Sequence, residues 1–185
     1  MITTADASAY VFYSSGNRAT VDSPDVHLVA GPDASGSCTV FPCATVTMGS
    51  WNDAAAVSIS FFAADPSNML VPATYYTDLL LISNTGRASS SIESIQITNV
   101  AGTMSDLGSI TVNYCPTQTE FSPNGAPITS CVGSFAITSS AGGYVSGTFP
   151  QTIAKGTYQY IEIVAYAAST ARSGSITFDI VVQSN

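Results

Sequence analysis

Four cysteines are the residues of this chain most suited to chemistry, and they fall into two local pairs. Cys38 and Cys43 lie in CTVFPC, while Cys115 and Cys131 bracket CPTQTEFSPNGAPITSC. Four cysteines allow three connectivities, and proximity favours the disulfides Cys38–Cys43 and Cys115–Cys131. Four buried thiols are the alternative. Zinc is disfavoured, because the spacings do not match paired CxxC knuckles and His27 stands apart. Disulfides would place the protein outside a reducing cytosol.

Groups for catalysis are scarce. A nucleophilic triad needs a base beside the nucleophile, and His27 is the only histidine. It lies in VDSPDVHLVA at alternating spacing, which is typical of an ordinary strand residue. The 12 acidic residues form no recognisable carboxylate pair for glycoside hydrolysis, and no P-loop, GxGxxG or HExxH motif occurs. We predict that the protein is not an enzyme.

Calcium is the ion best matched to the acidic residues, yet their pattern does not favour a site. Calcium takes about six to eight oxygen ligands, commonly from one dense acidic loop. The candidates are instead spread out, with Asp22, Asp25 and Asp33 around one predicted strand and Asp65 and Asn68 in a loop. Aspartate is also a common turn former. We therefore expect no metal site and no cofactor.

The charge of the chain makes two classes of binding partner unfavourable. The net charge is −8, and the four basic residues, Arg18, Arg87, Lys155 and Arg172, form no run. Nucleic acids and acidic membrane surfaces require clustered Lys or Arg, so neither is an expected partner. No apolar stretch approaches the roughly 18 residues that span a bilayer. Because polar residues follow Met1, we expect either a cytosolic chain or a secreted protein whose signal peptide is already removed.

The elements that must position these residues are strands. Apolar residues recur with a period of two almost throughout, as in ITFDIVV at 176–182 and SIQITNV at 94–100. The run DLLLI at 78–82 is continuously apolar, which predicts a central strand covered on both faces. Short strands separated by Gly, Pro and Asn turns predict an all-β antiparallel sandwich. The expected strands are residues 8–14, 19–30, 39–49, 55–63, 75–83, 92–99, 108–114, 132–138, 143–148, 156–167 and 174–183.

The first expected strand fits either of two sheets. Residues 5–13, ADASAYVFY, would complete either an edge of their own sandwich or the sheet of another copy. One face of the strand carries Ala5, Ala7, Ala9, Val11 and Tyr13, and the other carries Asp6, Ser8, Tyr10 and Phe12. Small residues followed by larger ones suit a narrow groove, and sheet edges accept added strands. In this hypothesis residues 1–17 are a donor strand and hinge, with Ser15-Gly16-Asn17 as the hinge, and residues 18–185 are one sandwich domain.

A family resemblance points the same way. The segments VPATYYTDLLLISNTG at 71–86, SIESIQITNV after it and AKGTYQYIEIVAYAAS at 154–169 share a pattern. In it, Tyr opens a hydrophobic strand that ends in a polar turn. With the N-terminal strand, the pattern resembles the TasA/camelysin-like class of secreted jelly-roll proteins, which includes bacterial biofilm fibre subunits and archaeal bundling pili and threads. The resemblance implies a jelly-roll-like β-sandwich that polymerises by donor-strand complementation. The cysteine pairs depart from the bacterial members and fit an extracellular archaeal filament better.

These observations predict a structural subunit of an extracellular, cell-surface filament, a homopolymer with possible bundling or surface adhesion. The predicted donor residues are Ala5, Ala7, Ala9, Tyr10, Val11, Phe12 and Tyr13. The predicted acceptor groove is lined by Leu79, Leu81, Ile161, Ile163, Phe178 and Ile180. The alternatives are a monomeric cell-surface or carbohydrate-binding jelly-roll module built on Trp51 and exposed tyrosines, or a viral capsid protein.

Overall fold

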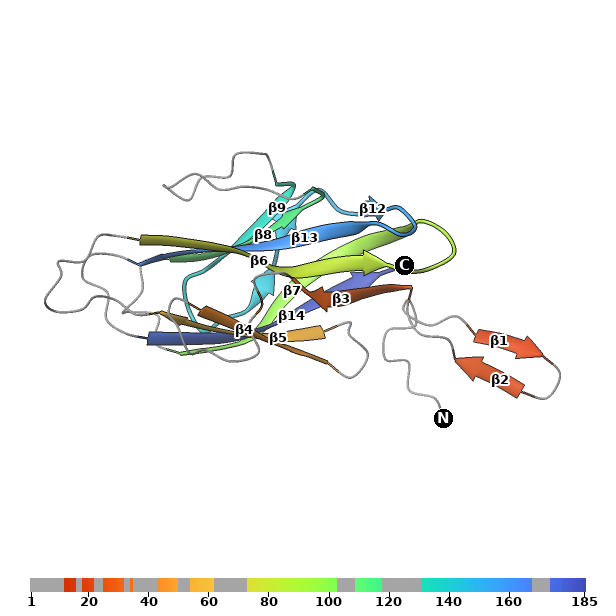
Figure 1. The fold of residues 1–185 in the computed structure, drawn as a ribbon, viewed down its shortest axis with the longest axis horizontal. Helices are drawn as coiled ribbons and strands as arrows, with labels where there is room; N and C mark the ends of the chain where they lie inside the picture. The colour runs from red at the N-terminus through yellow and green to blue at the C-terminus, as the bar shows by residue number, and fades with distance from the viewer. Residues whose placement is uncertain are drawn as a thin grey trace, which may run out of the picture.

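The structure is a computed structural model of the 185-residue chain. It describes residues 12–15, 18–21, 25–31, 34, 43–49, 54–61, 73–102, 109–117, 131–167 and 174–185. The regular secondary structure of these residues consists of β-strands, which form two six-stranded antiparallel sheets and one two-stranded sheet. The two larger sheets pack face to face as layers (Figure 1). The predicted all-β sandwich is therefore confirmed.

The first large sheet has the strand order β10-β7-β14-β5-β4, with β12 also paired to β7. Its strands are β10 (Gly143–Tyr144), β7 (Ser90–Gly102), β14 (Gly174–Ser184), β5 (Ala54–Phe61), β4 (Cys43–Met48) and β12 (Gln151–Ile153). The second large sheet has the order β11-β9-β8-β13-β6-β3. Its strands are β11 (Ser146–Gly147), β9 (Gly133–Ile137), β8 (Ser109–Cys115), β13 (Tyr158–Ala167), β6 (Ala73–Asn84) and β3 (Val26–Ala30).

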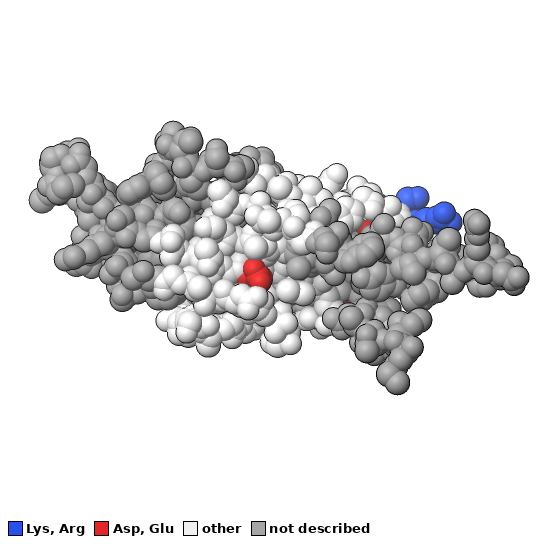
Figure 2. Space-filling view, turned by 90° about the horizontal axis from the view of Figure 1, so that it is seen from below, with Lys and Arg blue, Asp and Glu red and all other residues white. Residues whose placement is uncertain are grey.

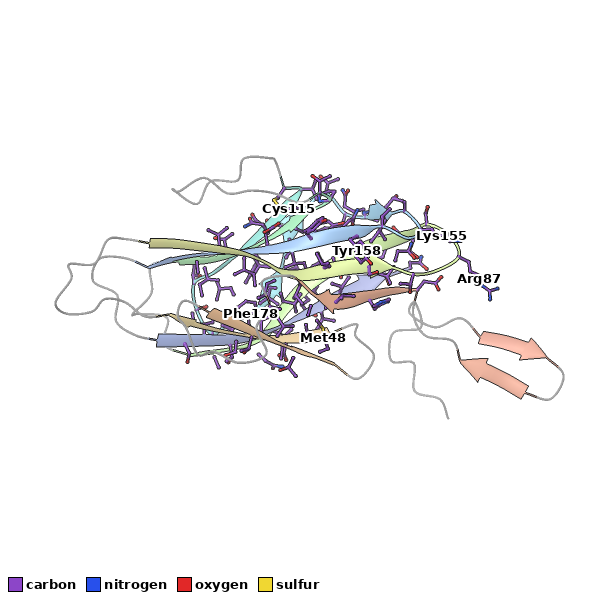
Figure 3. The ribbon with its side chains drawn as sticks, viewed as in Figure 1. Met48, Arg87, Cys115, Lys155, Tyr158 and Phe178 are labelled. Atoms are coloured by element: carbon purple, nitrogen blue, oxygen red, sulfur yellow. A yellow bond between two sulfur atoms is a disulfide. The ribbon has the colours of Figure 1, made fainter. Side chains whose placement is uncertain are left out.

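The core lies between these two sheets and follows from strand periodicity. In β14, Ile176, Phe178 and Ile180 are at most 1% exposed, whereas Thr177 and Asp179 between them face outward. Every second side chain of a strand points to the same face. In β7, Ile95 and Ile97 repeat the alternation, and Ile92 is also buried because the pairing with β14 shifts register between Ser94 and Ile92. Figure 3 shows Phe178 between the layers.

The continuously apolar segment of β6 is explained by a bulge rather than by two equally covered faces. The pairing of β6 with β13 shifts register between Ile161 and Glu162, whose partners are Leu80 and Asp78. The extra residue, Leu79, breaks the alternation. Leu79 and Leu80 are consequently both fully buried, while Leu81 on the outer face is only half-buried.

The N-terminal part of the chain forms a separate hairpin. β1 (Phe12–Ser15) pairs with β2 (Arg18–Val21) from Phe12 opposite Val21 to Ser15 opposite Arg18. The two strands extend from one end of the sandwich, beyond β3 (Figure 1). The single strand expected over 19–30 is thus two strands, β2 and β3. Pro24, which has no backbone N–H for a ladder bond, lies in the sequence between them.

Candidate functional site

The two lateral sides of the sandwich differ, and one of them is closed by the chain itself. β10 pairs with β7 of the first sheet, and β11, two residues later, pairs with β9 of the second. Val145 between them is 4% exposed, and its N–H donates to the carbonyl of Ile95 at 2.9 Å. β12 then covers the next part of β7, where Ile153 is fully buried. The chain therefore passes from one sheet to the other between β10 and β11 and covers the core on this side.

The opposite side is bounded by β4 and β3, the outermost strands of the two sheets. β4 pairs with β5 over six positions without a register shift, and no described strand pairs with its other edge. Its sequence, CATVTM, has no charge and no proline. Natural edge strands usually carry such features, or are very short or bulged, which prevents them from pairing with other chains. The β4 edge has none of these protections.

Side chains along β4 also leave the rim of the core incompletely covered. Val46 and Met48 pack against the core, yet both are only half-buried. Thr47, which faces outward between them, is exposed. Figure 3 shows Met48 on the lower of the two layers. A strand added beside β4 would bury the remaining apolar surface of Val46 and Met48 as well as pair its backbone groups.

A second open stretch lies on β6. β3 is five residues long and pairs only with Leu80–Asn84 of β6. The Gly31 N–H continues the contact by donating to the Leu79 carbonyl at 2.8 Å. Beyond that point, residues 73–78 of β6 have no partner among the described strands on this edge. Among the described strands, the outer edges of β4 and β3 and this stretch of β6 are therefore all unpaired on the side of the sandwich bounded by β3 and β4.

The predicted acceptor residues lie mostly in the core. Leu79, Ile161, Ile163, Phe178 and Ile180 are at most 1% exposed, and Leu81 is half-buried on the outer face. β13 is paired on both edges, by β6 and β8, and β14 by β5 and β7. Of the three strands that carry these residues, β6 alone has an edge that is partly unpaired among the described strands. The assignment of an acceptor groove to these residues stays a prediction.

The predicted donor strand is described only at its end. Ala5, Ala7, Ala9, Tyr10 and Val11 lie outside the described residues. Phe12 and Tyr13 belong to β1 and face Val21 and Thr20 of β2. Ser15, expected in the hinge, is the last residue of β1, and Arg18, expected to begin the sandwich, is the first of β2. β2 therefore pairs with the proposed arm, not with either large sheet, while the division at residue 17 itself stays a prediction.

One of the two predicted disulfides is present. The Cys115 and Cys131 sulfur atoms are bonded, and their Cα atoms are 4.3 Å apart. The bond ties the end of β8 to the residues just before β9 and so closes the 16-residue separation between them. Cys38 lies outside the described residues, so the Cys38–Cys43 pairing stays a prediction.

A buried asparagine joins the loops at the end of the sandwich nearest the hairpin. Asn84 is fully buried, and its Nδ2 donates to the carbonyls of Ala88 at 2.9 Å and Ile153 at 3.0 Å. Its Oδ1 accepts the N–H of Gly86 at 2.9 Å. The β6–β7 and β12–β13 connections are thereby held together. The sequence gives no local signal for this role, because the partner Ile153 is 69 residues away.

A second buried polar group is Tyr114 on β8. Its hydroxyl donates to Oε1 of Gln159, whose Nε2 donates to the Thr152 carbonyl at 3.0 Å. The ring stacks on Phe149 with centroids 5.5 Å apart. Burial disfavours the charged phenolate and raises the pKa of Tyr114 above its ordinary value. These contacts satisfy the phenol in the neutral state, which is a structural role.

Groups for other kinds of function do not come together in the described part of the chain. There, no three His, Cys, Asp or Glu residues lie close enough to hold a metal ion, and His27 is half-buried in β3. No described helix is long and apolar enough to cross a membrane. Tyr144 and Tyr158 are 60% and 52% exposed, but they lie on different sheets and so form no shared platform. Trp51 lies outside the described residues.

Comparison with known proteins adds no family. No protein-family model matches the chain, and no curated protein matches it.

Proposed function

We propose that this protein is a structural subunit of an extracellular filament, a pilus or biofilm-matrix fibre, which polymerises by adding its N-terminal strand to the sandwich of a neighbouring copy. The observation that carries the proposal is a mismatch in strand pairing. Among the described strands, β1 and β2 pair only with each other, and none pairs with the outer edge of β4. A hairpin that pairs with neither large sheet and an outer edge of β4 that no described strand occupies are complementary.

The hairpin supports this proposal because of its size. It contains four residue pairs, and an isolated two-stranded hairpin is at best marginally stable in water. A third strand, or packing against a hydrophobic face, is needed for independent stability. Docking on a neighbouring copy would supply it. The segment before β1, rich in Ala and followed by aromatic residues, is the part of the arm that we assign to the neighbour's sheet.

The β4 edge can provide enough free energy for a lasting contact. A partner strand along its six residues would form about six ladder hydrogen bonds, each contributing roughly 1 kcal/mol net. Burying two or three large side chains of the donor adds about 1.5–3 kcal/mol each. The sum, on the order of 10 kcal/mol before ordering costs, is compatible with a persistent polymer. Because the donor and acceptor surfaces differ, the contact is head-to-tail and generates a filament unless the rotation closes it.

Deleting residues 1–14 tests the donor. We expect the shortened protein to stay folded and monomeric, and the unmodified protein to form fibres visible by electron microscopy. A synthetic peptide of residues 1–14 should bind the shortened protein and raise its melting temperature, since a ligand that binds only the folded state stabilises it by about 2.7 kcal/mol at 100 times its Kd. The same peptide with Val11→Asp is the control. Fibre formation that is unchanged by the deletion would refute the proposal.

Lysine substitutions test the acceptor. Lysine on an edge strand disfavours strand addition, so Thr47→Lys on β4 should reduce peptide binding several-fold. Thr177→Lys is the matched control, because Thr177 is also exposed on the outer face of the same sheet but lies on β14, which is paired on both edges. Equal effects of the two substitutions would show that β4 is not the acceptor edge, even if fibres form.

A further inference from the structure

Two exposed cations stand together at one end of the sandwich. Arg87 lies in the connection between β6 and β7, and Lys155 lies in the connection between β12 and β13. Both side chains are exposed and neither has an ion pair with a described residue. Figure 2 shows the described Lys and Arg atoms gathered at one end of the molecule, and Figure 3 shows Arg87 and Lys155 projecting there. We call this pair the basic tip.

Backbone hydrogen bonds hold the two loops of the basic tip together. Asn84 contributes its backbone as well as its three side-chain bonds. The Asn84 N–H donates to the Thr157 carbonyl at 3.1 Å, and the Asn84 carbonyl accepts the Gly156 N–H at 2.8 Å. Within the second loop, the Thr157 N–H and hydroxyl both donate to the Ala154 carbonyl. Loops fixed in this way present Arg87 and Lys155 from a preformed surface, which lowers the ordering cost of a contact.

The basic tip also adjoins the root of the N-terminal arm. The sandwich begins after the hairpin at Asp25 and β3, and the Asp25 carbonyl accepts the N–H of Thr85 in the β6–β7 connection at 2.8 Å. The Asp25 side chain lies against Gly86, where an added Cβ would come within 2.3 Å of its Cγ. Figure 1 shows the hairpin leaving from this end. The hairpin and the basic tip therefore lie at the same end of the sandwich.

We propose that the basic tip docks on an acidic surface of the second copy that accepts the arm. This inference rests on the proposed function and adds a second contact to it. Complementarity of charge supports it: the tip displays two of the four basic residues of a chain that has 12 acidic ones, so a second copy offers more acidic than basic side chains. The exposed Asp25 carboxylate beside Gly86 leaves the tip and its surroundings with a net positive charge of one. Two such acidic copies repel each other overall, and a local cation pair offsets that repulsion in one orientation. Charge pairs of this kind mainly raise the rate of association and set its direction.

Charge neutralisation with a matched control tests the contact. Arg87→Gln with Lys155→Gln removes two positive charges, and Thr138→Glu with Ser140→Glu, at exposed positions of the β9–β10 connection, adds two negative ones. Both double variants make the net charge more negative by the same amount. Fibre elongation is followed by light scattering at low ionic strength, and melting temperatures confirm that both variants are folded.

We expect the Gln variant to elongate about tenfold more slowly than the unmodified protein, and the Glu variant to stay within about twofold of it. The deficit of the Gln variant should shrink at high salt, where surface charges are screened. Equal slowing of both variants would assign the effect to general repulsion and overturn the contact. Normal elongation of the Gln variant would overturn it as well. If the unmodified protein formed no fibres, the proposed function itself would fail, and this contact with it.

Discussion

Replacing Asn84 by alanine should destabilise the fold by about 3 kcal/mol. The substitution removes three side-chain hydrogen bonds: two donated to the carbonyls of Ala88 and Ile153 and one accepted from the N–H of Gly86. Asn84 is fully buried, so the backbone groups that lose their partners are poorly placed to bond to water instead. An unsatisfied buried group costs about 1–3 kcal/mol. Three such groups, one of them only partly buried, give about 3 kcal/mol after modest relaxation.

Urea unfolding of the monomeric protein, followed by far-UV circular dichroism, measures this loss. We expect the midpoint to fall while the slope of free energy against urea stays the same, because the surface exposed on unfolding is unchanged. Thr85→Ala is the control, since the adjacent Thr85 is exposed and surface substitutions are usually within about 0.5 kcal/mol. A loss below about 1 kcal/mol for Asn84→Ala would refute the view that this side chain joins the two loops.

Three further predictions concern the sandwich. Gly102→Ala should lower the free energy of unfolding in urea by more than about 2 kcal/mol, because the φ of Gly102 is 121° and an added Cβ would lie 2.1 Å from a backbone oxygen. Gly156→Ala should lower it by only about 1 kcal/mol, because Gly156 has a φ of 70° and open space around it. Similar losses for the two substitutions would contradict this prediction. Stability should fall as the pH rises above about 10, where the unfolded phenol ionises and the buried Tyr114 does not, and Tyr114→Phe should reduce that fall; an unchanged pH dependence would show that Tyr114 is not responsible. Replacing Cys115 and Cys131 by serine should lower stability by about 3 kcal/mol from the loop-closure term, and a melting temperature equal to that of the unmodified protein would be inconsistent with the bond.

The strands were predictable because their signal is local. Alternation in ITFDIVV is visible in the sequence, and Ile176, Phe178 and Ile180 are buried as it requires. β12 was missed because its three residues form a strand only through pairing with Ser90–Ile92 of β7. Such a short element has too few residues to show a period, and its existence depends on a partner far away in the chain.

The position of β4 as an outermost strand also depends on distant pairing, so the sequence could not predict it. The apolar composition of three segments indicates burial, namely residues 78–82, 161–163 and 176–182. Apolar side chains from all three segments do lie in the core. Their composition does not indicate which strand ends up outermost, since that depends on the pairing order of the whole sheet. β4, with two threonines and one valine, gives a weaker sequence signal than β13 or β14, yet it is an outermost strand whose other edge no described strand pairs with.

The most direct test of the account is a high-resolution electron-microscopy reconstruction of the purified protein under conditions in which it assembles. We expect unbranched fibres in which the part of residues 5–13 that precedes β1 pairs, in each subunit, along the β4 edge of the next. A uniform population of monomers, with residues 5–13 paired to their own sandwich, would contradict it.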